Sequence, residues 1–160
     1  MNSAPLPKRR EVSFVVIDNS HMEKHGVEYF CALAENFMLV TQNPNHPAFS
    51  IKADNMYILL QDKLDLNEML EIMYEKYGAN RATIQTGGTI NSLFLRGGLI
   101  DYANIVIAPA FIGGKDTPTL IDGVCFTDEA QLKFVSSLTL EEVNVLENSY
   151  IQLKYRVNRK

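Results

Sequence analysis

Two adjacent glycines, Gly87 and Gly88, stand where a short β-patterned run gives way to a helix-patterned run in RATIQTGGTINSLFLRGGLID, residues 81–101. Glycine has no Cβ, so a ligand can approach its backbone closely. The first turn of a helix also offers unpaired N–H groups and a partial positive charge, which suit a phosphate. Thr89 and Asn91 can add side-chain donors, although Thr89 can equally be an N-cap residue. Two interpretations stay open at this point: a phosphate site, or a tight strand-to-helix turn without a ligand.

The other polar groups that could do chemistry fit no known motif. His21 and His25 are four residues apart in HMEKH, but this is not H-E-x-x-H and no third ligand has a suitable spacing, so we predict no metal site. Ser92 lies within the helix pattern without a G-x-S-x-G turn, which disfavours a serine hydrolase. Asp116 and Asp122 flank a turn-rich segment, and we interpret them as turn formers.

Composition limits the classes of partner. The chain has 160 residues, a net charge of −4 and basic clusters only in PKRR and RVNRK, so we expect no nucleic-acid partner. Its longest apolar runs are too short to span a bilayer, and the start lacks the pattern of a signal peptide. Cys31 and Cys125 are far apart and form no C-x-x-C, as in a cytoplasmic chain whose thiols are reduced and packed as small hydrophobic groups. We expect one domain over residues 1–160, located in the cytoplasm and without a membrane partner.

The first half of the chain predicts strands buried on both faces. Residues 12–18, 37–42 and 55–61 are continuous apolar or β-branched runs of the kind found in parallel sheets. The proline-containing segment after the second run is a loop, and its His46 is interpreted as structural. The segment DLNEMLEIMYEKYG predicts a helix that Asp65 caps at its start, with Glu68 three residues on, and that Gly78 ends.

The second half predicts a β-α-β unit followed by a hairpin. The unit consists of a strand at 81–85, a helix at 89–96 and a strand at 102–108. FIGGKDTPTLIDG is then a surface loop. LKFVSSLTLEEVNVLE and SYIQLKYRV alternate apolar and polar residues around ENSY, which predicts an antiparallel hairpin. The expected fold is an α/β domain with a mostly parallel sheet flanked by helices and an antiparallel C-terminal hairpin.

Four phrases in this order resemble a known family. They are TGGT at 86–89, GLID at 98–101, IAP at 107–109 and IGG at 112–114. Together with VVIDNS and LVTQN upstream, they resemble the reductase domain of riboflavin biosynthesis, the C-terminal half of the bifunctional deaminase–reductase. The resemblance covers essentially the whole chain and implies a dihydrofolate-reductase-like fold.

The resemblance also implies an activity. Members are NADPH-dependent reductases of the 5-amino-6-(5-phosphoribosylamino)uracil reductase type, which reduce the ribosyl unit of a pyrimidine substrate to a ribityl chain by hydride transfer. Carried onto this sequence, the cofactor residues would be Gly87, Gly88, Thr89, Ile90, Asn91, Ser92, Leu93, Asn19, Ser20 and Thr41, with Gln42 beside them. Thr86 occupies the substrate-side position that is often glutamate in the family. No catalytic acid or base is nominated, because the nicotinamide carries the chemistry.

The chain departs from the family at its start, where full domains have an additional strand, helix and strand. We therefore expect an N-terminally truncated domain in which one apolar strand edge lacks a neighbour, and a homodimer that covers it. Two functions from different classes remain. One is an active NADPH-dependent reductase, and the other is a non-catalytic remnant that binds nucleotide or dimerises.

Overall fold

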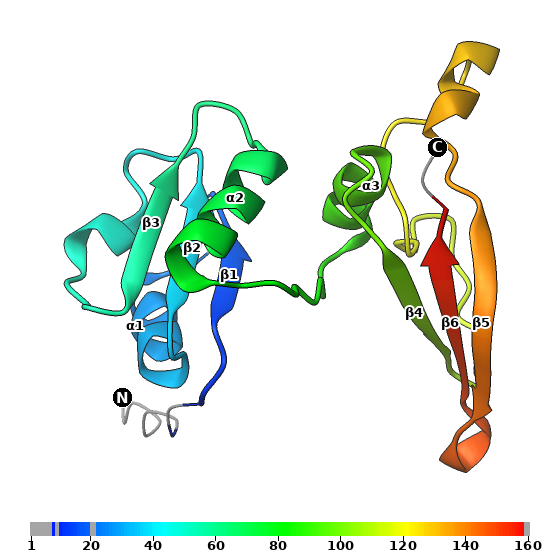
Figure 1. The fold of residues 1–160 in the computed structure, drawn as a ribbon, viewed down its shortest axis with the longest axis horizontal. Coiled ribbons are helices and arrows are strands. Elements are labelled where there is room, and N and C mark those ends of the chain that lie inside the picture. The colour runs from blue at the N-terminus through cyan, green and yellow to red at the C-terminus, as the bar shows by residue number, and fades with distance from the viewer. Residues whose placement is uncertain (1–7, 9, 20–21, 159–160) are drawn as a thin grey trace. The chain divides into compact units, whose positions relative to one another are not determined.

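The computed structural model describes residues 8, 10–19 and 22–158, so Ser20 lies outside the described residues. The chain divides into two compact units, Met1–Arg81 and Ala82–Lys160, whose elements are labelled in Figure 1.

The first unit contains a three-stranded parallel sheet. Its strands are β1 (Phe14–Ile17), β2 (Phe37–Thr41) and β3 (Met56–Leu60), in the order β1-β2-β3. The middle strand, β2, is buried at all of its positions. The three predicted strands are therefore confirmed, with ends that differ by at most two residues from those expected.

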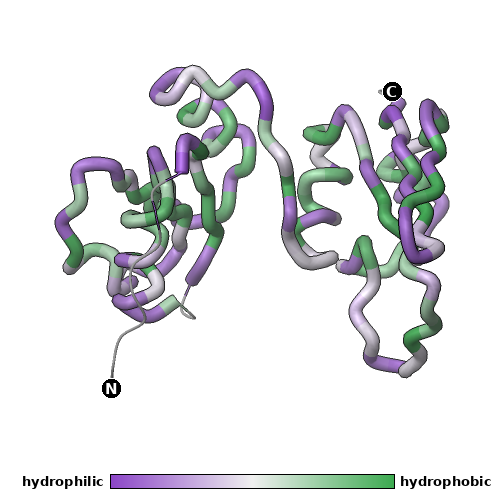
Figure 2. The backbone as a smooth tube through the Cα atoms, turned by 90° about the horizontal axis from the view of Figure 1, so that it is seen from below, coloured by the Kyte–Doolittle hydropathy of each residue, from purple (hydrophilic) through white to green (hydrophobic). Residues whose placement is uncertain are grey.

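One helix packs on each face of this sheet. On one face, Phe30 of α1 (Lys24–Leu33) stacks on Phe37 of β2 with 5.3 Å between ring centroids. On the other face, Lys76 of α2 (Leu66–Tyr77) lies 4.0 Å above the Tyr57 ring of β3. Hydrophobic residues run along the strands between the two helices (Figure 2). A short helical turn, η1 (Pro47–Ser50), joins the core on the α1 side through Ala48.

The ends of α2 follow the predicted capping chemistry. Asp65 accepts hydrogen bonds from the backbone N–H groups of Asn67 and Glu68, and Gly78 ends the helix with φ 63°. The Glu68 side chain does not complete a capping box, because its carboxylate accepts from Gln61 Nε2 at 2.6 Å. Gln61 Oε1 in turn accepts from the backbone N–H of Asp65, at 3.0 Å.

The second unit contains a helix and an antiparallel sheet. Its elements in chain order are α3 (Gly88–Arg96), β4 (Tyr102–Ile107), η2 (Glu129–Phe134), β5 (Leu138–Val145), η3 (Glu147–Ser149) and β6 (Ile151–Val157). The strand order is β4-β6-β5, and both pairings are antiparallel. The predicted helix and C-terminal hairpin are confirmed, and residues 111–123 form the expected exposed segment.

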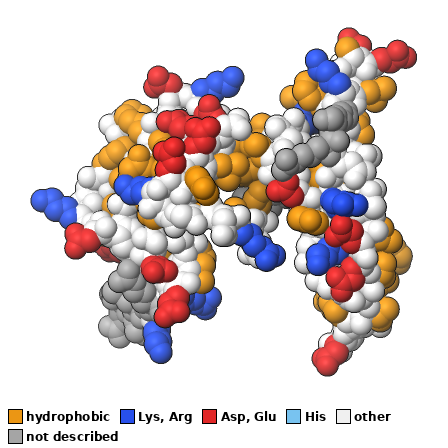
Figure 3. Space-filling model, viewed as in Figure 1, with side chains coloured by type: hydrophobic (Ala, Val, Ile, Leu, Met, Phe, Trp, Pro, Cys, Tyr) orange, Lys and Arg blue, Asp and Glu red, His pale blue; other side chains and the backbone are white. Residues whose placement is uncertain are grey.

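The two faces of this second sheet differ in chemistry. On one face Lys154 lies 3.5 Å from Glu142 and Arg156 lies 3.5 Å from Glu141. Acidic and basic side chains alternate along this unit in Figure 3. The other face is apolar across all three strands, with Ile105 opposite Leu153 and Leu153 opposite Val143.

Three features differ from the sequence-based expectations. Residues 81–85 form no strand, because none of them pairs with a described strand. The predicted β-α-β unit is therefore wrong, and β4 instead pairs antiparallel with β6. Helix α1 was not predicted, and Cys125 is exposed rather than packed, whereas Cys31 is half-buried.

Candidate functional site

Gly87 leaves the first turn of α3 open. It is the N-cap residue, with φ −75° and ψ 166°. A glycine N-cap offers no side-chain oxygen to the N–H groups of the first turn. A Cβ built on Gly87 would meet nothing within 4 Å. There is therefore open space beside the N-cap of α3, and the first-turn N–H groups of a helix are the groups that bind an anion at such a position.

Gly88 has a different role, because a turn of the chain lies against it. A Cβ on Gly88 would come within 2.5 Å of both the backbone oxygen of Thr119 and Asp122 Oδ2. The backbone N–H of Asp122 also donates to the carbonyl oxygen of Gly88, at 3.0 Å. The missing Cβ of Gly88 therefore allows the turn 119–122 to pack on α3.

Asn91 joins this turn to the residue before the glycines. Its Oδ1 accepts from the Thr86 hydroxyl at 2.7 Å, and its Nδ2 donates to the backbone oxygen of Leu120 at 3.1 Å. Nδ2 also lies within hydrogen-bond distance of the Thr86 backbone oxygen, at 3.3 Å. The predicted substrate residue Thr86 and the predicted cofactor residue Asn91 are thus in direct contact.

Asp122 places a negative charge beside the positive end of α3. The Thr119 hydroxyl, and to a lesser extent the Thr119 backbone N–H, donate to this carboxylate and hold the pKa of Asp122 below its ordinary value. The group is therefore ionised near neutral pH. Because its pKa is lowered on folding, its stabilising contribution is present above the ordinary pKa and is lost as the pH falls through the folded value. The sequence indicated the turn, but not its contact with Gly88.

The remaining predicted residues of α3 differ in exposure. Thr89 is exposed and Leu93 is 45% exposed, whereas Ile90 is half-buried. Ser92 is only 2% exposed. Its Oγ lies 3.0 Å from where a Cβ of Gly123 would be. Ser92 therefore packs against the segment after the turn, and Thr89 is the residue whose side chain solvent can reach at the start of the helix.

In the first unit, amide side chains join the carboxyl ends of the strands. Asn19 Oδ1 accepts from the backbone N–H of Gln42 at 2.8 Å, and Asn19 Nδ2 donates to Gln42 Oε1 at 3.2 Å. Gln42 Nε2 donates to the backbone oxygen of Asp62 at 3.2 Å. Asn19 and Gln42 are exposed at the sheet edge where open α/β sheets bind ligands.

Thr41 is placed less favourably for ligand contact. It is 1% exposed, and its Oγ1 accepts from the backbone N–H of Asn43 at 3.1 Å. The structure therefore forms two groups of predicted residues, each within its own unit: Thr86, Gly87, Gly88 and Asn91 around α3, and Asn19 with Gln42 at the sheet edge.

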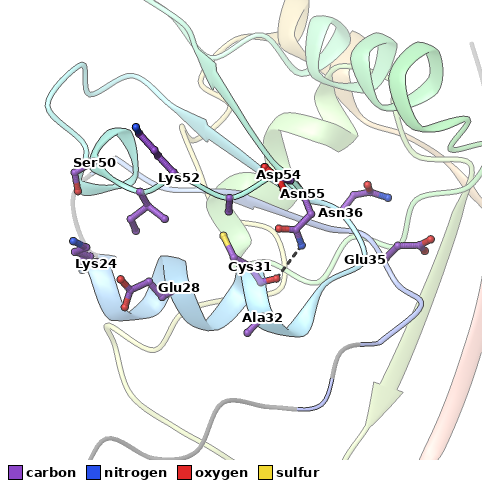
Figure 4. A pocket seen from close by; sticks show the side chains of 12 residues that line it. Lys24, Glu28, Cys31, Ala32, Glu35, Asn36, Ser50, Lys52, Asp54 and Asn55 are labelled. Atoms are coloured by element: carbon purple, nitrogen blue, oxygen red, sulfur yellow. Dashed lines mark hydrogen bonds between the residues drawn. The ribbon is translucent and has the colours of Figure 1, made fainter.

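A groove of about 840 Å³ runs along α1, beside residues 50–55 (Figure 4). Lys24 and Lys52 line it together with Glu28 and Glu35. Burial raises the pKa of the Cys31 thiol on its wall. The mixed charges of this groove favour no single class of ligand.

The predicted absence of a metal site remains a prediction. His21 lies outside the described residues, and the exposed His25 ring lies 3.3 Å from Glu23. The described part of the chain contains no group of three or more His, Cys, Asp or Glu side chains suited to a metal ion. Among the same residues, no helix is long and apolar enough to cross a membrane.

Comparison with protein families decides the class. The RibD C-terminal domain family matches residues 2–146, which span both units. The chain belongs to this family. The resemblance drawn from the glycine-containing phrases is thereby confirmed. The matched residues include the start of α3 with Gly87, Gly88 and the adjacent Asp122, hereafter the α3 mouth, and the carboxyl ends of the parallel strands.

Two relatives are named as reductases. The chain is 29% identical over 87 residues to the 2,5-diamino-6-ribosylamino-4(3H)-pyrimidinone 5′-phosphate reductase of Archaeoglobus fulgidus, over 54% of this chain and 39% of the relative. It is 35% identical over 88 residues to the same-named enzyme of Methanothermobacter thermautotrophicus, over 53% of this chain and 40% of the relative. The matches thus span about two-fifths of the length of these relatives, and they support an oxidoreductase.

Solved structures support the RibD-type reductase fold. A pyrimidine reductase-like protein of Corynebacterium diphtheriae aligns with a TM-score of 0.64 at 15% identity, over 91% of this chain and 61% of that protein. A putative riboflavin biosynthesis protein of a Shewanella species aligns with a TM-score of 0.59 at 18% identity, over 94% and 76%. RibD of Acinetobacter baumannii gives 0.57 at 17% identity, over 78% and 38%.

The two glycines differ in how they suit the phosphates of a nicotinamide cofactor. Gly87 leaves open space, whereas Gly88 has the Asp122 carboxylate beside it. The open position at Gly87 and the exposed Thr89 suit an anion at the helix start. The Asp122 carboxylate at Gly88 opposes that anion electrostatically. The residues present therefore fit the group on the Gly87 side.

The two glycines should respond differently to the same substitution. Gly88→Ala forces a Cβ into the Thr119 backbone and Asp122, and we expect it to destabilise the protein by about 1–3 kcal/mol. Gly87→Ala enters open space, and we expect a change below about 0.5 kcal/mol. Urea unfolding of both variants beside the wild type measures the difference. Equal effects would contradict the close contact at Gly88.

Proposed function

We propose that the chain is an NADPH-dependent reductase of riboflavin biosynthesis that reduces the ribosyl unit of a ribosylamino-pyrimidine phosphate to a ribityl chain. The observation that carries this proposal is the open first turn of α3 at Gly87, in a chain of the RibD C-terminal domain family. The names of the two reductase relatives support the substrate class.

The residues of α3 would hold the cofactor by their backbone. NADPH, when bound, supplies the hydride. The first-turn N–H groups of Gly88, Thr89 and Ile90 would bind its pyrophosphate through the opening at Gly87. Within the first unit, Asn19 and Gln42 are exposed at the carboxyl ends of β1 and β2, and their amide groups would contact a nucleotide there.

Asn91 would act by positioning Thr86. Its two amide atoms hold the Thr86 hydroxyl and the turn at Leu120 at the same time. Thr86 would thereby be presented to substrate in a fixed orientation. Holding two reactants in a productive geometry accounts for a large part of the rate of such reactions, so the proposal needs no acid or base from this segment.

Binding of NADPH tests the proposal directly. NADPH at about one hundred times its Kd should add about 2.7 kcal/mol to the unfolding free energy, which raises the melting temperature by several degrees. We expect Gly87→Val to abolish this rise without lowering the melting temperature of the free protein, because its side chain fills the open space at the helix start. A wild-type protein that shows no shift with NADPH or NADH would contradict the proposal.

The charge of Asp122 gives a second test. We expect Asp122→Asn to tighten NADPH binding modestly at low salt, because the substitution removes a negative charge that repels the phosphates. The gain should shrink at high salt. Asp116→Asn removes the same charge elsewhere in the exposed segment and serves as the control. Calorimetric titration of both variants measures the effect, and weaker binding by Asp122→Asn would mean that the carboxylate contacts the ligand favourably.

A homodimer is the second part of the proposal, and the apolar face of the β4-β6-β5 sheet favours it. Val145 is 81% exposed, Val143 54% and Leu140 50%, all on one face of β5. Apolar patches of this kind mark interaction surfaces. The partner that we propose is a second copy, because the same apolar face on two chains can pack together about a two-fold axis. Dimerisation without hydride transfer would favour the alternative function, a non-catalytic module.

The oligomeric state tests the dimer. We expect sedimentation to give twice the mass of one chain for the wild type and the mass of one chain for Val143→Glu, because a charge would be buried in an apolar contact. Asn104→Glu places the same residue on the polar face opposite Lys154 and should leave the mass unchanged. A monomeric wild type would overturn the dimer and leave the reductase proposal standing.

A further inference from the structure

A buried histidine in the first unit is held through both of its ring nitrogens. The side chain of His46 is 0% exposed. Its Nδ1 accepts from the backbone N–H of Ala48 at 3.1 Å, and its Nε2 lies 2.9 Å from Asp18 Oδ2. Because Nδ1 accepts from a backbone N–H, the ring hydrogen belongs on Nε2, which donates it to the carboxylate.

Asp18 connects two loops through the same carboxylate oxygen. Besides the His46 ring, Oδ2 accepts from the backbone N–H of Met22 at 3.0 Å. Asp18 directly follows β1, Met22 precedes α1, and His46 lies in the segment after β2. The contact between Asp18 and His46 thus links the segment that follows β1 to the segment that follows β2.

Asn19, the residue after Asp18, belongs to the exposed edge. Its Oδ1 accepts from the backbone N–H of Gln42, and its backbone oxygen accepts from Asn43 Nδ2 at 2.8 Å. The exposed amides of Asn19 and Gln42 are therefore connected to the Asp18–His46 pair through the backbone between Asp18 and Asn19. Any shift of Asp18 moves Asn19 with it.

The hydrogen bond between His46 Nε2 and Asp18 is not needed to form the turn η1. His46 caps η1 through Nδ1 alone, and a short side chain such as asparagine performs that role in other proteins. A buried polar atom is costly unless it is paired, so the Asp18 contact is a specific feature of this site.

We propose that Asp18 and His46 are positioning residues for nucleotide binding: they hold Asn19 and Gln42 in the geometry that accepts the hydrogen-bonding groups of a nucleotide. This inference rests on the proposed function. The pair does not touch the ligand and acts only through the exposed amides.

Two substitutions at His46 separate its two bonds. His46→Asn keeps an acceptor for the Ala48 N–H and loses Asp18, whereas His46→Gln is long enough to reach Asp18 and loses the cap. We expect His46→Asn to weaken NADPH binding in calorimetry about tenfold, the order expected when one hydrogen bond to a charged group is lost, and His46→Gln to weaken it less. The exposed His25→Asn is the matched control and should leave binding unchanged.

A spectroscopic measurement and a second variant keep the test independent of folding defects. Nitrogen NMR of the wild type should show the Nε2–H tautomer at His46, and hydrogen exchange at Asn19 and Gln42 should be faster in His46→Asn. Asp18→Asn keeps an acceptor oxygen without the charge and should weaken binding by an intermediate factor.

The outcomes distinguish the two proposals. A wild type that binds NADPH and a folded His46→Asn that binds it equally well would overturn the positioning role alone, as would an Nδ1–H tautomer. A wild type that binds no nucleotide would overturn the proposed function and the positioning role with it.

Discussion

The close approach of the turn 119–122 to Gly88 is the constraint on which the α3 site depends. With any side chain at Gly88, the Thr119 backbone would have to move, and with it the contact from Leu120 to Asn91. The approach also brings Asp122 to the start of the helix, where its charge opposes an incoming anion. The geometry of the mouth and its electrostatic potential therefore have one cause, which is the missing Cβ of one residue.

In the first unit, the exposed polar groups at the carboxyl ends of the strands are arranged differently. Its strands are too apolar to offer binding groups within the sheet, so the polar groups lie where the strands end. The exposed Asn19 bonds to Gln42, and the preceding residue, Asp18, contacts the buried His46. A loop held by both a surface and an interior contact has fewer accessible conformations, and less ordering entropy is lost when a ligand binds.

Sequence patterns predicted the helices and strands whose formation depends on residues within or next to them. Continuous β-branched runs identified β1 to β3, and the capping residues Asp65 and Gly78 located α2 to the residue. Helix α1 was not predicted, because Glu23 gives no side-chain cap and Gly26 interrupts the helical sequence pattern. Residues 81–85 have strand-like composition, but a strand requires a neighbour, and composition carries no information about that neighbour.

Contacts between residues far apart in the chain also limited what the sequence could predict about the candidate site. The motif TGG indicated a backbone-binding turn, yet Gly87 and Gly88 look equivalent in sequence, and only contacts from about 30 residues downstream distinguish them. The sequence offered no sign of the contact that His46 makes, because its partner Asp18 lies 28 positions away. Asp122 shows the consequence for function. A residue that the sequence predicts as a turn former also places a negative charge beside the start of α3, so the electrostatic potential there depends on a loop that no glycine motif includes.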